Sequence, residues 1–240
     1  MSNELISEEE LTRKRTPSEL LDWVGQKTDQ IYYSGDAGRR ALRLYNKGPA
    51  KELMKKFMDE AIPLAVFGKR KFGDTDQVLL QPVIDDPRYD AVVTDLTTDP
   101  PTESFVEITL SHEGRDNYLR RCQLLEKGYV FPYAPVVKAK AKKGQAFSIP
   151  PEANSVEERV GNELKRILAA ARRKEGKEYP PNTSLIIFFD DAPHFQDVMD
   201  NEKLDGFVSR DILSLDLRFS TLYLVGRDVV FREYSLVKKI

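Results

Sequence analysis

The stretch Thr183–Phe189 is the feature that most constrains the fold, because it reads Thr-Ser-Leu-Ile-Ile-Phe-Phe. Its last five residues, Leu185–Phe189, form an unbroken apolar run, which lacks the polar alternation of a half-exposed strand and is typical of a strand covered on both faces. Such a strand lies inside a sheet that has helices on either side. We therefore predict an α/β (α+β) fold in which helices flank a central sheet.

Three shorter strands precede this run in close succession, at residues 78–84, 89–94 and 104–110. The segments between them, Asp85-Asp86-Pro87 and Thr98-Asp99-Pro100-Pro101, are rich in residues that interrupt strands. Because links this short join antiparallel neighbours, the three strands are expected to form a meander. Together with the buried strand, they predict a mixed sheet.

Helical spacing of apolar residues, together with capping residues, predicts further elements around these strands. The predicted helices cover residues 16–27, 38–45, 49–62, 115–127 and 156–174, and Pro63 is expected to limit the third. Additional strands are predicted at residues 129–137 and 145–149, and a C-terminal hairpin at residues 221–225 and 229–234. We treat residues 1–47 as an N-terminal helical extension and residues 48–240 as one α/β domain.

Cysteine and histidine are scarce in this chain. Cys122 is the only cysteine, so an internal disulfide is excluded and a reducing compartment is expected. One thiol and two histidines, His112 and His194, also exclude a thiolate zinc site built within one chain. A divalent ion would be held mainly by carboxylates, which favours hard ions such as Mg²⁺ or Mn²⁺.

The charge of the chain is nearly balanced, with 37 basic against 39 acidic residues and a net charge of −2. This balance argues against a broadly basic surface for nucleic acid, although a local basic patch can still bind phosphate. No apolar stretch approaches the roughly 18–20 residues of a membrane span. The first residues lack the basic and apolar regions of a secretory signal, so we expect a cytoplasmic protein.

Two acidic residues lie on strands that are expected to be neighbours. Asp90 stands near the start of the strand at residues 89–94, and Glu107 lies within the strand at residues 104–110. If these strands pair, the two carboxylates can face each other, and the pKa of one rises unless a divalent ion neutralises them. The pair is therefore a candidate metal site. In the alternative interpretation, Glu107 points to solvent and Asp90 caps a turn.

This layout resembles the PD-(D/E)XK nuclease-like superfamily over roughly residues 49–189. That family has a restriction-endonuclease-like α-β-β-β-α-β core, with an acid on one strand, an acidic-x-Lys triplet on the next, and often a helix-borne Glu. The resemblance implies that Asp90 and Glu107 bind Mg²⁺ or Mn²⁺, with Glu60 (or Asp59) as a third acid. Gln123 resembles a polar residue that some members place beside the site. The chain also resembles bacterial hypothetical proteins with an Asp-Ala strand start and a Val-Glu-(Val/Ile)-Thr strand.

The chain departs from the family pattern at Thr109, which stands where the triplet has its lysine. The family lysine positions or activates the attacking water and stabilises charge on the phosphate, and threonine cannot supply that charge. Some relatives carry the cation on the next helix, where this chain has Arg115, Arg120 and Arg121. Of these, Arg120 is the preferred catalytic candidate. Otherwise the ion alone activates the water, or activity is lost.

Several other polar residues admit a functional or a structural interpretation. His112 follows the third strand and can reach the same site, and His194 follows the buried strand. The alternating lysines can follow a phosphate backbone or, as we favour, protect an edge strand from aggregation; they are Lys138, Lys140, Lys142 and Lys143. The group Arg172-Arg173-Lys174 complements the C-terminal end of its helix, which accounts for it structurally.

Two functions are consistent with these features. The first is a Mg²⁺- or Mn²⁺-dependent phosphodiesterase that acts on DNA or RNA, in which Thr109 and a neighbouring arginine assist the attack of water on phosphorus. The second is a catalytically inactive protein of the same fold that binds a partner protein or nucleic acid. The missing lysine and the absence of a basic surplus favour the second function. The sequence contains no nucleophile elbow and no Gly-rich phosphate loop that would support another chemistry.

Overall fold

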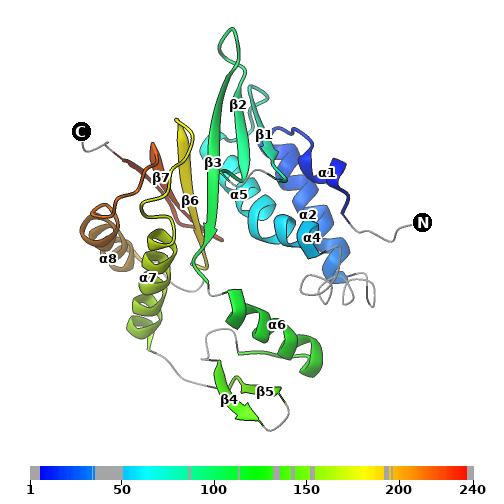
Figure 1. The fold of residues 1–240 in the computed structure, drawn as a ribbon, viewed down its shortest axis with the longest axis vertical. Coiled ribbons are helices and arrows are strands. Elements are labelled where there is room, and N and C mark those ends of the chain that lie inside the picture. Colours follow the sequence, from blue (N-terminus) through cyan, green and yellow to red (C-terminus); the bar gives the residue numbers. More distant parts are fainter. Residues whose placement is uncertain are drawn as a thin grey trace.

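The computed structural model contains a central sheet between two layers of helices (Figure 1). The residues that it describes are 6–33, 35, 51–85, 88–112, 114–131, 136–141, 144–151, 155–191, 195 and 197–236. The helix predicted at residues 38–45 and His194 lie outside them. The mixed α/β architecture expected from the sequence is confirmed.

Six strands form the central sheet in the order β1-β2-β3-β6-β7-β8. Their bounds are β1 Val78–Pro82, β2 Ala91–Asp95, β3 Thr102–Leu110, β6 Thr183–Phe189, β7 Thr221–Gly226 and β8 Phe231–Ser235. The first three strands pair antiparallel, which confirms the predicted meander, and β7 and β8 form the predicted hairpin. Strand β6 pairs in parallel with β3 and with β7, so the sheet is mixed and β6 is internal.

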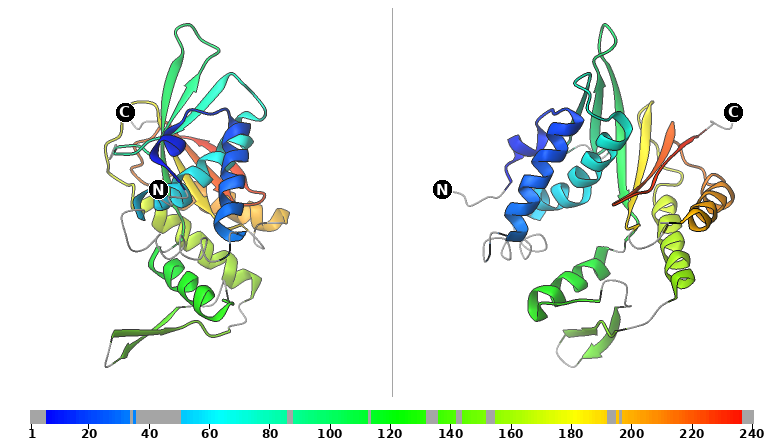
Figure 2. Two further views of the ribbon diagram at one scale, coloured as in Figure 1. Left: turned by 90° about the vertical axis from the view of Figure 1, so that its right-hand side faces the viewer. Right: turned by 180° about the vertical axis from the view of Figure 1, so that it is seen from behind.

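Helices cover both faces of this sheet (Figure 2). On one face lie α1 Glu8–Thr12, α2 Pro17–Tyr33, α4 Lys51–Lys56, the π-helical turn η1 Phe57–Ala61 and α5 Ile62–Phe72. On the other lie α7 Val156–Arg172, α8 Val198–Phe207 and a second π-helical turn, η2 Val208–Ile212. Between β3 and α7 the chain forms α6 Gly114–Lys127 and a separate hairpin of β4 Val137–Ala141 and β5 Gly144–Ser148. None of the described helices is long and apolar enough to cross a membrane.

The side chains of β6 alternate between two hydrophobic cores, one on each face of the sheet. Ile186 and Phe188 pack with side chains of α2 and α5. Leu185, Ile187 and Phe189 pack with side chains of α7 and α8. Because successive side chains of a strand point to opposite faces, a strand covered on both sides must be apolar at every position.

The N-terminal helices belong to the first of these cores. Leu11, Leu20 and Val24 pack in the cluster that also contains Leu80 of β1. The Arg15 backbone pairs with Leu80 through two hydrogen bonds, at 2.8 and 3.0 Å. Residues 6–33, which the sequence suggests as an extension, therefore cover one face of the sheet.

The helix that was expected to end at Pro63 continues past it, so that expectation is wrong. The Ile62 N–H donates to the Phe57 carbonyl oxygen across the π-helical turn η1, and α5 starts there. Proline lacks an N–H, and the first turn of a helix, where Pro63 lies, tolerates that loss. Asp59 and Glu60 consequently lie inside a continuous helical run rather than at its end. Single π-helical turns of this kind are frequent at functional sites.

One further expectation needs correction, and one helical segment is absent from the predicted elements. The strand predicted at residues 129–137 is wrong, because residues 129–131 are not in a strand and β4 begins only at Val137. The signal against a strand in the sequence is the pair Pro132 and Pro135, because proline cannot donate to a strand ladder; residues 132–135 lie outside the described residues. The helix α8 and the turn η2 at residues 198–212 are not among the elements predicted from the sequence, because the apolar residues of α8 do not gather on one helical face.

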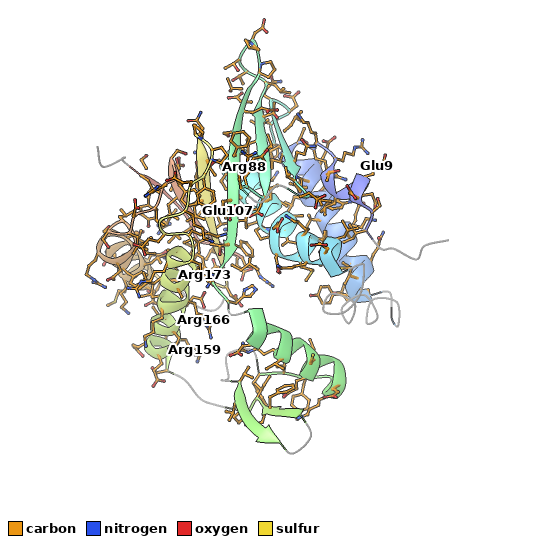
Figure 3. All side chains as sticks on the ribbon, in the orientation of Figure 1. Glu9, Arg88, Glu107, Arg159, Arg166 and Arg173 are labelled. Carbon is orange, nitrogen blue, oxygen red and sulfur yellow. The ribbon has the colours of Figure 1, made fainter. Side chains whose placement is uncertain are left out.

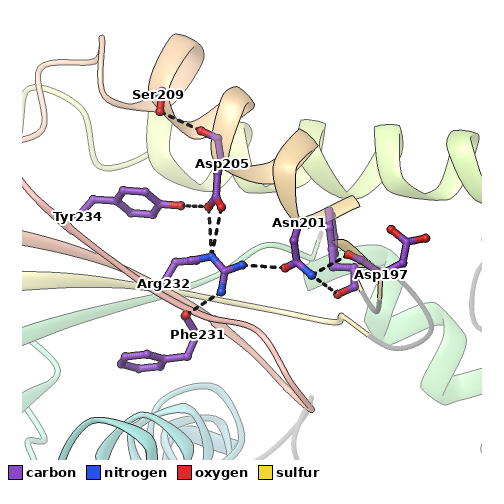
Figure 4. A network of polar contacts seen from close by, with 8 residues as sticks. Asp197, Asn201, Asp205, Ser209, Phe231, Arg232 and Tyr234 are labelled. Atoms are coloured by element: carbon purple, nitrogen blue, oxygen red, sulfur yellow. Dashed lines mark hydrogen bonds and ion pairs between the residues drawn. The ribbon is translucent and has the colours of Figure 1, made fainter. Parts of the chain in front are cut away.

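A polar network attaches α8 to the edge strand β8 (Figure 4). Arg232 donates to Asp205 Oδ1 at 3.1 Å and to Asn201 Oδ1 at 3.0 Å. The Tyr234 hydroxyl donates to Asp205 Oδ1 at 2.7 Å, and burial together with this carboxylate raises the pKa of Tyr234. Tyr234 therefore remains a donor, and the network holds α8 against the sheet.

Asp191, just after β6, holds the tip of the β7–β8 hairpin. Its buried carboxylate accepts hydrogen bonds from three successive backbone N–H groups, those of residues 228–230, each at 2.7 Å. Arg70 donates to the carbonyl oxygens of Gly226 and Val230, both at 2.8 Å. A Cβ at position 226 would collide with the Asp191 carboxylate, so glycine is required there.

We expect Asp191→Ala to lower the free energy of unfolding by about 3 kcal/mol, because it leaves buried N–H donors without an acceptor. Urea denaturation measures this change. Asp228→Ala removes an exposed carboxylate from the same turn and is the control, with an expected change below about 0.5 kcal/mol. Equal stabilities of the two variants would contradict the role assigned to Asp191.

Candidate functional site

Asp90 and Glu107 lie beside each other on neighbouring strands. The β2–β3 register pairs Ala91 with Val106, so one further step along each strand sets Asp90 opposite Glu107. The Asp90 N–H donates to the Val106 carbonyl oxygen, and Asp90 Oδ2 accepts from the Ile108 N–H, both at 2.8 Å. These two bonds hold Asp90 against β3 at the start of β2.

Glu107 is buried, with 7% of the residue exposed, which excludes the alternative in which it points to solvent. Every second side chain of a strand lies on one face, so Thr109 and Ser111 share the orientation of Glu107. All three contact α7 or the turn after it: Glu107 with Lys174, Thr109 with Arg173, and Ser111 with Glu163. We refer to these three contacts as the β3–α7 seam.

The end of α7 brings two cations to this seam (Figure 3). Lys174 Nζ forms an ion pair with Glu107 Oε1. Arg173 Nη2 donates to Thr109 Oγ1 at 3.3 Å and to the Leu110 carbonyl oxygen at 2.7 Å. The interpretation of these residues as helix-end charges alone is therefore incomplete. Two positive charges at the end of α7 therefore lie beside Glu107 and Thr109.

Glu60 comes from the opposite helical layer, in the turn η1. Its Oε2 forms an ion pair with Lys56 Nζ at 3.0 Å. Lys56 Nζ also lies 3.8 Å from Asp90 Oδ1, so Glu60 is a helix acid that shares a lysine with Asp90. We refer to Glu60, Asp90 and Glu107 as the acid cluster.

Burial raises the pKa of all three carboxyl groups of the acid cluster. Burial and then the charge of Asp90 raise the pKa of Glu60 to about 8, against the opposing charge of Lys56. Burial likewise raises the pKa of Asp90, and at Glu107 the charge of Asp90 adds to the rise in pKa. The charges of Lys56 and Lys174 oppose this rise in pKa, so the two ammonium groups favour the ionised form of the carboxyl groups beside them.

Three neighbours of the acid cluster receive no role at the site from the sequence: Lys56, Lys174 and Tyr179. Burial, followed by the charges of Glu107 and Asp90, raises the pKa of Tyr179, which keeps its proton beside these carboxylates. Lys56 could have been found, because it stands four residues before Glu60, the usual spacing of a helical ion pair. Lys174 lies 67 residues from Glu107 in the chain, and no local pattern connects them.

Arg120 and Gln123 lie on α6. The cations whose charges act most strongly on the acid cluster come instead from α4 and from the turn after α7: Lys55, Lys56, Lys174 and Lys177. A catalytic role for Arg120 stays a prediction, as does one for His112, which directly follows the seam. The side chains of Arg115, Arg121, Lys138, Lys140, Lys142 and Lys143 lie outside what the structure describes.

The donor set of the acid cluster suits a hard divalent ion in its chemistry, because it consists of buried carboxylate oxygens. Within the described part of the chain, however, no three Asp, Glu, His or Cys side chains are already arranged so that they could hold a metal ion. The positive charges beside the carboxylates are the ammonium groups of Lys56 and Lys174. An ion that binds here would have to displace at least one of them.

Comparisons with protein-family models, with curated proteins and with solved structures found no match to this chain. The resemblance to the PD-(D/E)XK superfamily therefore has no support beyond the residues that suggested it. A fold alone does not define an activity, so function has to be argued from the acid cluster.

We expect the stability of the protein to fall between about pH 5 and pH 8, and to fall less in Glu60→Gln. The folded state keeps the Glu60 proton up to a pKa of about 8, whereas the unfolded chain releases it near the ordinary value of 4.5. Raising the pH through this window therefore favours unfolding, by an amount on the order of a few kcal/mol.

Urea denaturation of both proteins across this pH range measures the effect. Glu52→Gln removes an exposed glutamate from the same helical run and is the control, with the pH profile of the wild type. If Glu60→Gln also keeps that profile, Glu60 does not titrate as described.

Proposed function

We propose that this chain is a phosphodiesterase that acts on nucleic acid and depends on Mg²⁺ or Mn²⁺. The observation that supports this proposal is the acid cluster, in which buried carboxyl groups from a helix and two adjacent strands lie beside the ammonium groups of two lysines. Hydrolysis of a phosphodiester needs positive charge at the phosphate and an activated water. A cytoplasmic location is part of the proposal, in keeping with the single cysteine, Cys122.

Each residue of the site has a role in this proposal. Glu60, Asp90 and Glu107 would hold the ion, which supplies positive charge to the phosphate and lowers the pKa of a nearby water. Lys174 takes the part of the lysine in the acidic-x-Lys triplet, because its ammonium group already lies beside Glu107. Thr109 acts by holding Arg173, which fixes where α7 ends and hence where Lys174 lies.

A second function is favoured by the same lysines. Lys56 and Lys174 already offset the buried negative charge, so the acid cluster can be stable without any divalent ion. On that view the chain is a catalytically inactive protein that binds nucleic acid or a partner protein. Metal binding at the acid cluster distinguishes the two functions.

We expect titration calorimetry to show that Mn²⁺ binds the wild type and that Glu107→Gln weakens this binding by about tenfold or more. The substitution removes a charged oxygen donor while keeping the size of the side chain. Glu103→Gln, an exposed position on the same strand, is the control and should bind Mn²⁺ as the wild type does. Equal affinities of wild type and Glu107→Gln, or no binding to either, would exclude the site.

We expect Lys174→Met to lower the rate of Mn²⁺-dependent cleavage of a nucleic-acid substrate by roughly 10²–10³-fold, the usual loss when a group that stabilises transition-state charge is removed. Lys174→Arg keeps a positive charge and should retain more activity. Lys165→Met, at an exposed position of α7, is the control for loss of a lysine from this helix. Full activity of a folded Lys174→Met protein would exclude Lys174 from the reaction.

A further inference from the structure

Three arginines spaced seven residues apart form a row along one face of the helix: Arg159 and Arg166 of α7, and Arg173, its C-cap residue. Seven residues make almost two turns of an α-helix, so these side chains project from nearly the same side. Figure 3 shows them following one another along α7, with Glu107 beyond Arg173. We refer to them as the arginine row. It leads along the helix to the acid cluster.

Among the described residues of α7, no exposed acidic side chain lies on this face. The positions between the arginines on the same side are Asn162 and Ala169, both exposed and uncharged. The nearest acid on α7 is Glu163, which is 3% exposed and points into the β3–α7 seam. The chain as a whole has a nearly balanced net charge, but this face of α7 is a local basic stripe. The exposed acids of the helix lie on its other sides.

Contacts with residues of the β3–α7 seam orient Arg166 and Arg173. Arg166 Nη1 donates to Glu163 Oε2 at 3.0 Å, and Ser111 Oγ donates to the other oxygen of the same carboxylate at 2.5 Å. Arg173 is tied to β3 through Thr109 and the Leu110 carbonyl oxygen. A guanidinium carries five N–H donors, so these bonds orient each group without using up its capacity to bind a phosphate.

We propose that the arginine row binds the phosphate backbone of a nucleic-acid duplex and guides it to the acid cluster. The inference rests on the proposed function, which makes nucleic acid the substrate. Fourteen residues of helix separate the outer two arginines, a span of about 21 Å at 1.5 Å per residue. A straight row of fixed charges on that scale fits a stiff duplex, which presents one negative charge per roughly 1.7 Å of its axis.

A single strand fits this face less well. Proteins that bind single strands combine basic residues with exposed aromatic side chains on which the bases stack. Among the described residues, the large exposed aromatic side chains are found at the end of α2 and after α6, not on α7: Tyr32, Tyr33, Tyr129 and Phe131. The arginine row therefore offers contacts to backbone phosphates and none to bases.

The test measures binding of fluorescently labelled duplex DNA, duplex RNA and single-stranded DNA by anisotropy, in EDTA, over a series of salt concentrations. Because no divalent ion is present, the result does not depend on cleavage, and failure of the proposed reaction leaves it unaffected. The variant is the double substitution Arg159→Gln and Arg166→Gln, which spares Arg173 next to the acid cluster. The matched control is Lys165→Gln with Arg172→Gln, which removes two exposed charges from other sides of the same helix.

We expect the arginine double variant to bind duplex about tenfold or more weakly at low salt, and its plot of log affinity against log salt to be shallower by about 2. The control should lose much less, although its net charge is identical. Either duplex satisfies the proposal, and the two arms show which one the protein prefers. Equal losses in variant and control, or equally tight binding of single strand and duplex, would overturn it. Arg159→Gln alone leaves the Glu163 contact intact and should show half of the change in slope if the double variant folds poorly.

Discussion

The burial of three carboxyl groups, those of Glu60, Asp90 and Glu107, is the constraint on which the placement of the two helical layers depends. Taking Glu60, Asp90 and Glu107 out of water raises their pKa and costs free energy unless positive charge is buried with them. Lys56 provides that charge from the helical layer on one face of the sheet, and Lys174 from the layer on the other. The two layers are therefore tied together at this point, because a shift of either one would leave a buried carboxylate without its cation.

The parts of this site that the sequence predicts are those governed by local periodicity. Asp90 and Glu107 could be placed on adjacent strands because prolines mark the turns and short links force antiparallel pairing. That Glu107 shares a strand face with Thr109 follows from the same logic, whereas the burial of that face is decided by the contacts with α7 and the turn after it. The central position of Thr183–Phe189 could be predicted for a similar reason, as both of its faces are apolar.

The parts that could not be predicted depend on tertiary contacts or on a local change of helix type. Glu60 was placed at a helix end because Pro63 was expected to stop the helix, whereas the π-helical turn carries the helix through. Lys174 was assigned to its own helix end, and only the docking of α7 on β3 shows that it pairs with Glu107. Periodicity cannot reveal which end of a helix meets which strand, so the pairing of Lys174 with Glu107 could not be derived from the sequence.

The β3–α7 seam connects the two proposals made for this chain. Glu107 and Thr109 of β3, and Ser111 just after it, contact successive positions along α7 and its end. These contacts fix both the position of the helix along the strand and its rotation. Rotation decides which face of α7 is exposed, and that face carries the arginine row. The position of α7 along β3 decides where the helix ends, and that end places Lys174 beside Glu107. A threonine at position 109 is compatible with this arrangement, because a short hydroxyl side chain leaves room for Arg173, whereas a lysine there would bring a second positive charge against the guanidinium.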